Sequence, residues 1–261
     1  MSKSRRLTLA DVRAVLGVIG ECRDLGYDPV GWGRHLSEGL CRLTGTLVGV
    51  GGELRTPGRG AAGELVTLID SGLGPAERAA IDDFVRHRGF GGHPVSAVLD
   101  GWAGRVAART RRDLVPDRDW YGSLCYELFH RPIGTDHCLV SPHRLPDGSL
   151  HLITLHRTAG ERDFFPRERR LLLLAHAEVG RLMGPVLVRA DDPHSPARLP
   201  PRVREVLDCL LEGDSEKQAA ARMGLSRETV HQYVKALYRH YHVASRAELL
   251  ARVLRRPTPR G

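Results

Sequence analysis

The residues best suited to specific polar contacts lie at helical spacing near the C-terminal end of the sequence. Arg227, His231, Lys235 and Arg239 are four residues apart, so on a helix they form one row, with Gln232 beside it. Arginine and lysine neutralise phosphates, whereas glutamine and lysine reach base edges in the DNA major groove. We therefore expect a helix face that contacts nucleic acid. The alternative is the solvated face of an ordinary helical bundle.

The charge of the sequence is concentrated around this row. The chain has 261 residues and a formal net charge of +8. Residues 198–261 carry 13 Lys or Arg and 7 Asp or Glu, which leaves a net +6 in this quarter of the chain. Such an asymmetry favours a polyanion as the partner of the C-terminal segment. An arginine-rich composition with solvated faces is the alternative.

Four short helices are predicted to position the row. Ser215 and Gln218 have the spacing of a capping box at the start of the second helix. Only Gly224 and Leu225 separate the second helix from the third, which is the short glycine-containing turn of a helix-turn-helix. The predicted helices cover residues 202–211, 215–224, 226–241 and 245–254. The third would bury Val230, Val234, Leu237 and Tyr241.

Residues 199–255 resemble the LuxR-type helix-turn-helix domain of bacterial transcription regulators. The resemblance runs through residues 204–207, Gly213, 215–221, 225–226, 229–230, Val243 and 245–250. In that family the third helix enters the major groove. Pairs of such domains bind inverted half-sites, often through contacts between their fourth helices. The resemblance therefore implies an all-α domain of four helices that binds palindromic double-stranded DNA as a homodimer.

Carried over residue by residue, the resemblance implies three groups of contact residues. The base-facing residues would be His231, Gln232 and Lys235. The phosphate contacts would be Ser215, Lys217, Arg227, Thr229 and Arg239, and the dimer contacts Leu250, Val253 and Leu254. Three positions depart from the family: Pro200 replaces a capping threonine, His242 replaces a glycine, and Gln232-Tyr233 replaces an Asn-His pair. We expect these changes to alter sequence preference rather than to abolish binding.

The residues before this domain predict an α+β domain with an antiparallel sheet and flanking helices. Asp147-Gly148 is a turn dipeptide between two β-rich runs, and it indicates a hairpin. A linker is expected at 185–198, within a proline-rich stretch, between domains at 1–184 and 199–256. The expected helices cover 9–25, 30–43, 75–88, 119–130 and 166–183, and the expected strands 46–54, 64–69, 137–143 and 150–157.

The order of these elements resembles that of GAF- or PAS-like sensor domains. Residues 160–174 also resemble the end of sensor domains that precede LuxR-type modules. A phosphoacceptor receiver domain is excluded because it requires a lysine, and none lies between Arg5 and Glu216. Trp120 and Tyr121 are candidates for lining a sensor pocket, with ordinary core packing as the alternative. The ligand is not identified.

The sequence predicts no metal, cofactor or catalytic site. Successive side chains of a strand point to opposite faces, so His151 and His156 should lie on opposite faces of one strand. We therefore expect the histidines around them to be dispersed. The five cysteines are scattered and show no CxxC spacing, which favours free thiols in a reducing cytosol. No nucleophile motif surrounds the cysteines or serines, so an enzyme is not expected.

The sequence therefore predicts a cytoplasmic transcription regulator with an N-terminal sensor of a ligand or protein. The start of the chain does not resemble a signal peptide, and its longest apolar run, residues 171–175, is far too short to span a membrane. RNA polymerase is a further candidate partner. Two alternatives remain: a sigma-factor-like transcription protein, and an enzyme with a regulatory DNA-binding tail.

Overall fold

The chain folds into two compact units, and each is described here by itself. The computed structural model describes residues 6–55, 64–88, 94–95, 106–190, 192 and 194–254. One unit comprises residues 1–24 and 30–182, and the other comprises 25–29 and 183–261. No helix in the described part of the chain is long and apolar enough to cross a membrane.

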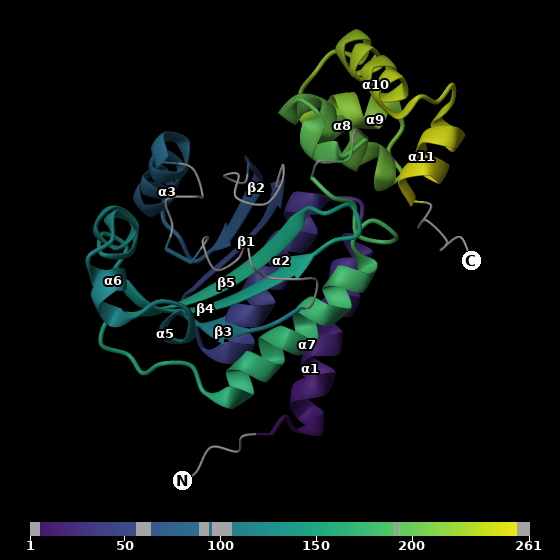
Figure 1. Cartoon of the computed structure of the whole chain (residues 1–261). Coiled ribbons are helices and arrows are strands. Elements are labelled where there is room, and N and C mark those ends of the chain that lie inside the picture. Colours follow the sequence, from purple (N-terminus) through teal and green to yellow (C-terminus); the bar gives the residue numbers. More distant parts are fainter. Residues whose placement is uncertain are drawn as a thin grey trace. The chain divides into compact units, whose positions relative to one another are not determined.

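A five-stranded antiparallel sheet forms the centre of the first unit (Figure 1). Its strand order is β2-β1-β5-β4-β3. The expected hairpin is present, because β4 pairs with β5, and β1 pairs with β2 in the same antiparallel manner. Gly148 turns the second hairpin with a φ of 86°, which glycine adopts without strain. The strands are β1 (Val48–Arg55), β2 (Glu64–Ser71), β3 (Arg109–Thr110), β4 (Thr135–Arg144) and β5 (Leu150–Thr158).

Both faces of the sheet are covered by helices. Figure 1 shows α1, α2 and α7 on one side and α3 and α6 on the other. Arg167 of α7 binds the carboxylate of Asp11 in α1, and this hydrogen bond lowers the pKa of Asp11 to about 2. The helices are α1 (Leu9–Asp24), α2 (Pro29–Thr44), α3 (Pro75–Arg88), α5 (Arg111–Leu114), α6 (Asp117–Tyr121) and α7 (Pro166–Leu182).

The expected helix at 119–130 was wrong in its continuity. The structure contains α6 and then a separate π-helical turn, η2 (Tyr126–His130). Ser123 interrupts the segment, because its hydroxyl donates to the carbonyl of Trp120 at 2.7 Å and accepts from the amide of Tyr126 at 3.1 Å. A side chain that bonds to nearby backbone groups in this way competes with a continuous helix.

In the part of the second unit that the structure describes, four α-helices surround one apolar core. The buried residues of α10 are the predicted set, Val230, Val234, Leu237 and Tyr241. The capping box of Ser215 and Gln218 is present, and Gly224 ends α9 with a φ of 65°. Pro200 provides no side-chain cap to α8. The helices are α8 (Pro201–Leu211), α9 (Glu216–Met223), α10 (Arg227–Tyr241) and α11 (Arg246–Leu254).

Candidate functional site

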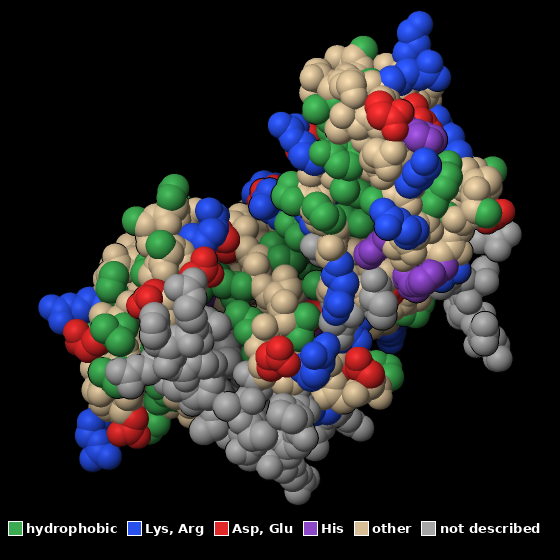
Figure 2. Space-filling model, turned by 90° about the horizontal axis from the view of Figure 1, so that it is seen from above, with side chains coloured by type: hydrophobic (Ala, Val, Ile, Leu, Met, Phe, Trp, Pro, Cys, Tyr) green, Lys and Arg blue, Asp and Glu red, His purple; other side chains and the backbone are tan. Residues whose placement is uncertain are grey.

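The helix α10 presents a polar, largely cationic face to solvent. Its N-terminus is fixed by Ser226, whose hydroxyl accepts from the amide of Thr229 at 3.0 Å. Because the four buried residues of α10 hold one face against the core, the opposite face is exposed. Figure 2 shows Lys and Arg side chains on the surface of this unit. The exposed side chains of the expected contact set are Arg227, Gln232, Lys235 and Arg239, whereas Thr229 and His231 are half-buried.

Two of the base-facing candidates have partners within the unit. Gln232 donates from its side-chain amide to Glu228 at 2.9 Å. Nδ1 of His231 lies 3.1 Å from the carboxylate of Glu216, at the start of α9. Glu216 was not expected from the sequence, because its role depends on how α9 packs against α10. A bound phosphate backbone would therefore meet two carboxylates, Glu216 and Glu228, among the cations of this face.

The remaining expected contact residues differ in exposure. Lys217 and Ser215 are exposed at the start of α9, although the hydroxyl of Ser215 is used in the capping box. On α11, Leu254 is 59% exposed, whereas Leu250 is half-buried and Val253 packs against the core of the unit. Leu254 is thus the most exposed of the three expected dimer contacts.

An apolar cavity lies between the sheet and α3 in the first unit. Its volume is about 70 Å³. Apolar side chains from separate elements form most of its wall, and two groups with hydrogen-bonding capacity join them. These are Thr154 and His156, and Oγ1 of Thr154 lies 2.9 Å from Nε2 of His156. The wall includes Val50 and Leu54 of β1, Ile81 and Phe84 of α3, Phe129 of η2 and Leu152 of β5.

Trp120 and Tyr121 are not part of this wall. Trp120 is completely buried, and its ring lies 4.5 Å from that of His130. Tyr121 lies at the surface, where its hydroxyl donates to Asp136 at 2.9 Å. The guanidinium of Arg111 lies 5.2 Å from the ring of Trp120 and donates to Asp136 at 3.3 Å. These contacts place both aromatic residues in a structural cluster.

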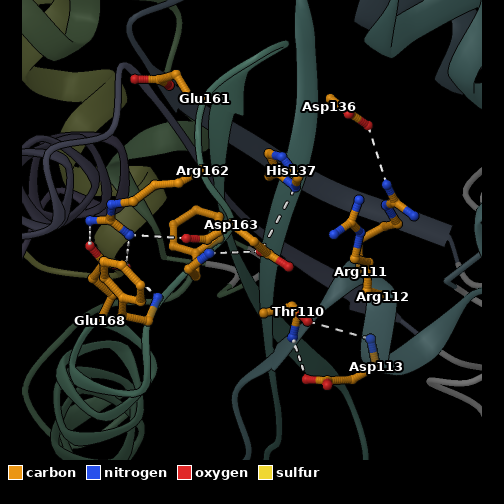
Figure 3. A network of polar contacts seen from close by, with 12 residues as sticks. Thr110, Arg111, Arg112, Asp113, Asp136, His137, Glu161, Arg162, Asp163 and Glu168 are labelled. Carbon is orange, nitrogen blue, oxygen red and sulfur yellow. Dashed lines mark hydrogen bonds and ion pairs between the residues drawn. The ribbon is translucent and has the colours of Figure 1, made fainter. Parts of the chain in front are cut away.

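A second polar cluster fixes the start of α7 (Figure 3). Glu168 is 4% exposed and accepts hydrogen bonds from Arg157, Arg162 and the amide of Phe165. Burial alone would raise the pKa of Glu168, but these three donors hold it below its usual value. Nδ1 of His137 lies 3.9 Å from the carboxylate of Asp163 in the same region. The cluster holds α7 in place.

The expected dispersal of the histidines was only partly correct. His151 and His156 lie on opposite faces of β5, as expected, because His156 borders the cavity and His151 contacts α7. However, His143 and His151 come together with His176 of α7, with ring centres 5.4 and 5.0 Å from that of His176. Across the described residues, no group of three or more His, Cys, Asp or Glu could hold a metal ion.

A serine hydrogen-bonded to histidines and the free cysteines are residue types found in nucleophilic sites, but in this structure they are buried. Ser141, His176 and His151 are hydrogen-bonded in series, at 2.8 and 2.9 Å. Ser141 is completely buried, so no substrate reaches its hydroxyl. Burial also raises the pKa of the Cys125 thiol to about 12, and all five cysteines are free and buried. These thiols are therefore poor nucleophiles.

Comparison with known proteins identifies the C-terminal unit. Residues 197–253 match the family described as bacterial regulatory proteins, luxR family. The match lies within the second unit and covers all of α8, α9 and α10. No curated protein matches the chain.

Several solved structures align with the chain at low sequence identity. Escherichia coli SdiA is 13% identical, with 91% of this chain and 89% of that chain covered and a TM-score of 0.40. SdiA in complex with octanoyl-rac-glycerol is 14% identical, with 95% of each chain covered and a TM-score of 0.44. The N-acylhomoserine lactone-dependent LuxR-family factor CepR2 from Burkholderia cenocepacia is 16% identical, with 64% and 94% covered and a TM-score of 0.46. At these TM-scores the likeness carries no conclusion about ligand or partner.

Proposed function

We propose that this chain, whose residues 197–253 belong to the luxR family of bacterial regulatory proteins, is a transcription regulator controlled by a small apolar ligand. The match of these residues to that family is the observation that carries the proposal. In this account α10 enters the major groove of a palindromic site. A homodimer supplies one α10 to each half-site.

The proposed DNA contacts lie on the exposed face of α10 and at the start of α9. The base-facing residues lie near the middle of the exposed face of α10; they are His231, Gln232 and Lys235. Glu216 orients the ring of His231 until DNA is bound. The phosphate contacts are Ser215, Lys217, Arg227, Thr229 and Arg239.

Leu250, Val253 and Leu254 of α11 form the dimer contact in the account. Leu254 is the most exposed of the three. RNA polymerase is a further partner in the cytoplasm, where the chromosome lies. The chain does not act as an enzyme in this account.

The cavity of the first unit is the proposed sensor site of a GAF/PAS-like domain spanning residues 1–184. Among the described residues of its wall there is no Lys, Arg, Asp or Glu, which favours an uncharged ligand. Thr154 and His156 provide one point for hydrogen bonding. A cavity of roughly 150 Å³ accommodates benzene, so a space of about 70 Å³ accepts only a slender apolar group unless its walls move.

Selection of binding sites from random double-stranded DNA tests this function. The full chain is incubated with the library, and bound fragments are amplified and sequenced over several rounds. We expect enrichment of an inverted repeat with half-sites about one helical turn apart. A library that is not enriched after repeated rounds at low salt would overturn the proposal.

A further inference from the structure

Three histidines lie together on the face of the sheet that is opposite the cavity. They come from different elements, His143 from β4, His151 from β5 and His176 from α7. His176 is completely buried and His151 is 4% exposed. Trp32 of α2 packs against this group, with its ring centre 6.1 Å from that of His151. The group therefore joins α7 to the two longest strands of the sheet.

The hydrogen bonds of this group run in one direction. The hydroxyl of Ser141 donates to the carbonyl of Ala107 at 2.7 Å, so its single proton is already used. It must then accept from Nδ1 of His176 at 2.8 Å. Nε2 of His176 lies 2.9 Å from Nδ1 of His151. In the neutral ring that donates from Nδ1, Nε2 of His176 is an acceptor, and Nδ1 of His151 is the donor.

This direction assigns the protonation state of His176. One of its ring nitrogens donates and the other accepts, which is the state of a neutral imidazole. An added proton at Nε2 would face the N–H of His151, and it would place a charge in a site with no exposure. Burial, together with His151 and His143, lowers the pKa of His176 well below 6.5.

The packing around His143 leaves little room for rearrangement. Gly180 of α7 lies directly against its ring, and a Cβ at position 180 would be only 1.9 Å from Cε1 of His143. Burial also lowers the pKa of His143. In the described part of the chain, Nδ1 of His143 is buried without a hydrogen-bond partner. The ring is therefore held by contact with the helix backbone.

The titratable groups near His176 are two histidines and, on the strand next to His151, the buried Glu53. The titratable groups that act on it are His143 of β4 and His151 of β5. On β1, Glu53 is buried and is paired with His151 in the strand register, so the two side chains share a face. Trp32 of α2 contributes no charge.

We propose that His143, His151 and His176 form an acid-sensitive lock that holds α7 on the sheet and releases it when the cytoplasm becomes acidic. The energetic direction follows from proton linkage. Histidine in the opened chain titrates near 6.5, whereas His176 in the closed structure stays neutral at lower pH. The opened state therefore binds more protons below about pH 6.5, so the docking of α7 on the sheet weakens as pH falls. α7 is the last helix of the first unit, so its release alters the chain that leads to the DNA-binding domain.

Hydrogen exchange of the backbone amides of α7 tests the lock in the full-length protein. Each proton taken up only on opening lowers the protection factor by about tenfold per pH unit. We expect the protection of residues 170–182 to fall by at least about tenfold per unit between pH 6.5 and pH 5. In the variant His176→Leu, which cannot titrate at this position, we expect the protection of α7 to fall less steeply with decreasing pH. The matched control, His35→Gln at a partly exposed histidine of α2, should behave as the original protein does.

A second measurement does not depend on a folded variant. The ring ¹⁵N shifts of the unaltered protein should identify His176 at pH 7.5 as the neutral tautomer with its proton on Nδ1. They should change only together with the loss of α7 protection. Titration of His176 near pH 6.5 with α7 still protected would overturn the proposal. So would protection that is unchanged between pH 7.5 and 5, or a His176→Leu variant that keeps the full pH dependence.

Discussion

The carboxylate of Glu216 lies 3.1 Å from Nδ1 of His231. This contact joins the first turn of α9 to the outward row of α10, the two helices of the proposed DNA-binding motif. It adds an acidic group from α9 to the largely cationic face of α10 and holds a base-facing candidate in place. Under the proposed function, DNA competes with this internal partner for His231.

Removing this carboxylate should strengthen DNA binding. In Glu216→Gln the side chain keeps its size but no longer repels phosphates, and we expect affinity at low salt to rise by about two- to fivefold. Fluorescence anisotropy with a labelled duplex measures the change. Glu205→Gln removes a carboxylate that pairs with Arg202 on α8, and it serves as the control. Equal effects of the two substitutions would contradict the role given to Glu216.

His242 should be an energetically unfavourable residue at the end of α10. It has a φ of 52°, a left-handed conformation in which glycine is not strained. We expect His242→Gly to raise the free energy of unfolding by about 0.5–1 kcal/mol in urea denaturation. Gly224→Ala places a side chain at the equivalent position of α9, where φ is 65°, and it should lower the stability by about 1 kcal/mol. If His242→Gly lowers the free energy of unfolding, then contacts of the histidine ring stabilise the protein by more than its left-handed backbone conformation destabilises it.

Two helical glycines should respond in opposite ways to alanine. Gly180→Ala forces the new methyl group into the ring of His143, so we expect a loss of about 1–3 kcal/mol despite the better helix propensity. Gly20→Ala on α1 meets no atom within 4 Å and should stabilise the protein by about 0.5–1 kcal/mol. Thermal unfolding of both variants measures the difference. If Gly180→Ala is as stable as Gly20→Ala, then His143 does not pack against α7 as described.

Filling the cavity should prevent the binding of apolar molecules. Val50 forms part of the wall, so Val50→Phe places a ring in a space of about 70 Å³. We expect the fluorescence of an environment-sensitive dye that carries a slender alkyl chain to fall at least about tenfold, because the chain loses its buried site. Leu47→Phe enlarges a residue that is 70% exposed and should leave dye binding unchanged. Undiminished binding to Val50→Phe would place the dye outside the cavity.

The features that depend on local periodicity could be predicted from the sequence. The spacing of Val230, Val234, Leu237 and Tyr241 identified the buried face of α10, and hence the exposed row. The turn residues Asp147-Gly148 located the hairpin of β4 and β5. In both cases neighbouring residues carry the information, so no knowledge of tertiary packing is needed.

The features that depend on packing between distant elements could not be predicted. The cavity wall combines Val50, Phe84 and Leu152, which meet only when β1, α3 and β5 are assembled. His176 is 25 residues from His151, and only the docking of α7 brings the two rings together. Glu216 is a favourable acid at a helix N-terminus in the sequence, and its contact with His231 depends on how the two helices pack.

Salt-dependent DNA binding by variants of α10 tests the central claim most directly. Affinity for the selected inverted repeat is measured from 50 to roughly 200 mM salt for the original protein, Lys235→Ala and Arg239→Ala, with Arg202→Ala on α8 as the charge-matched control. We expect Arg239→Ala to reduce the salt slope by about one phosphate contact. Lys235→Ala should lose about 1–3 kcal/mol of discrimination against altered half-sites. Wild-type affinity, slope and discrimination in both variants would contradict the proposal that α10 is the DNA-reading helix.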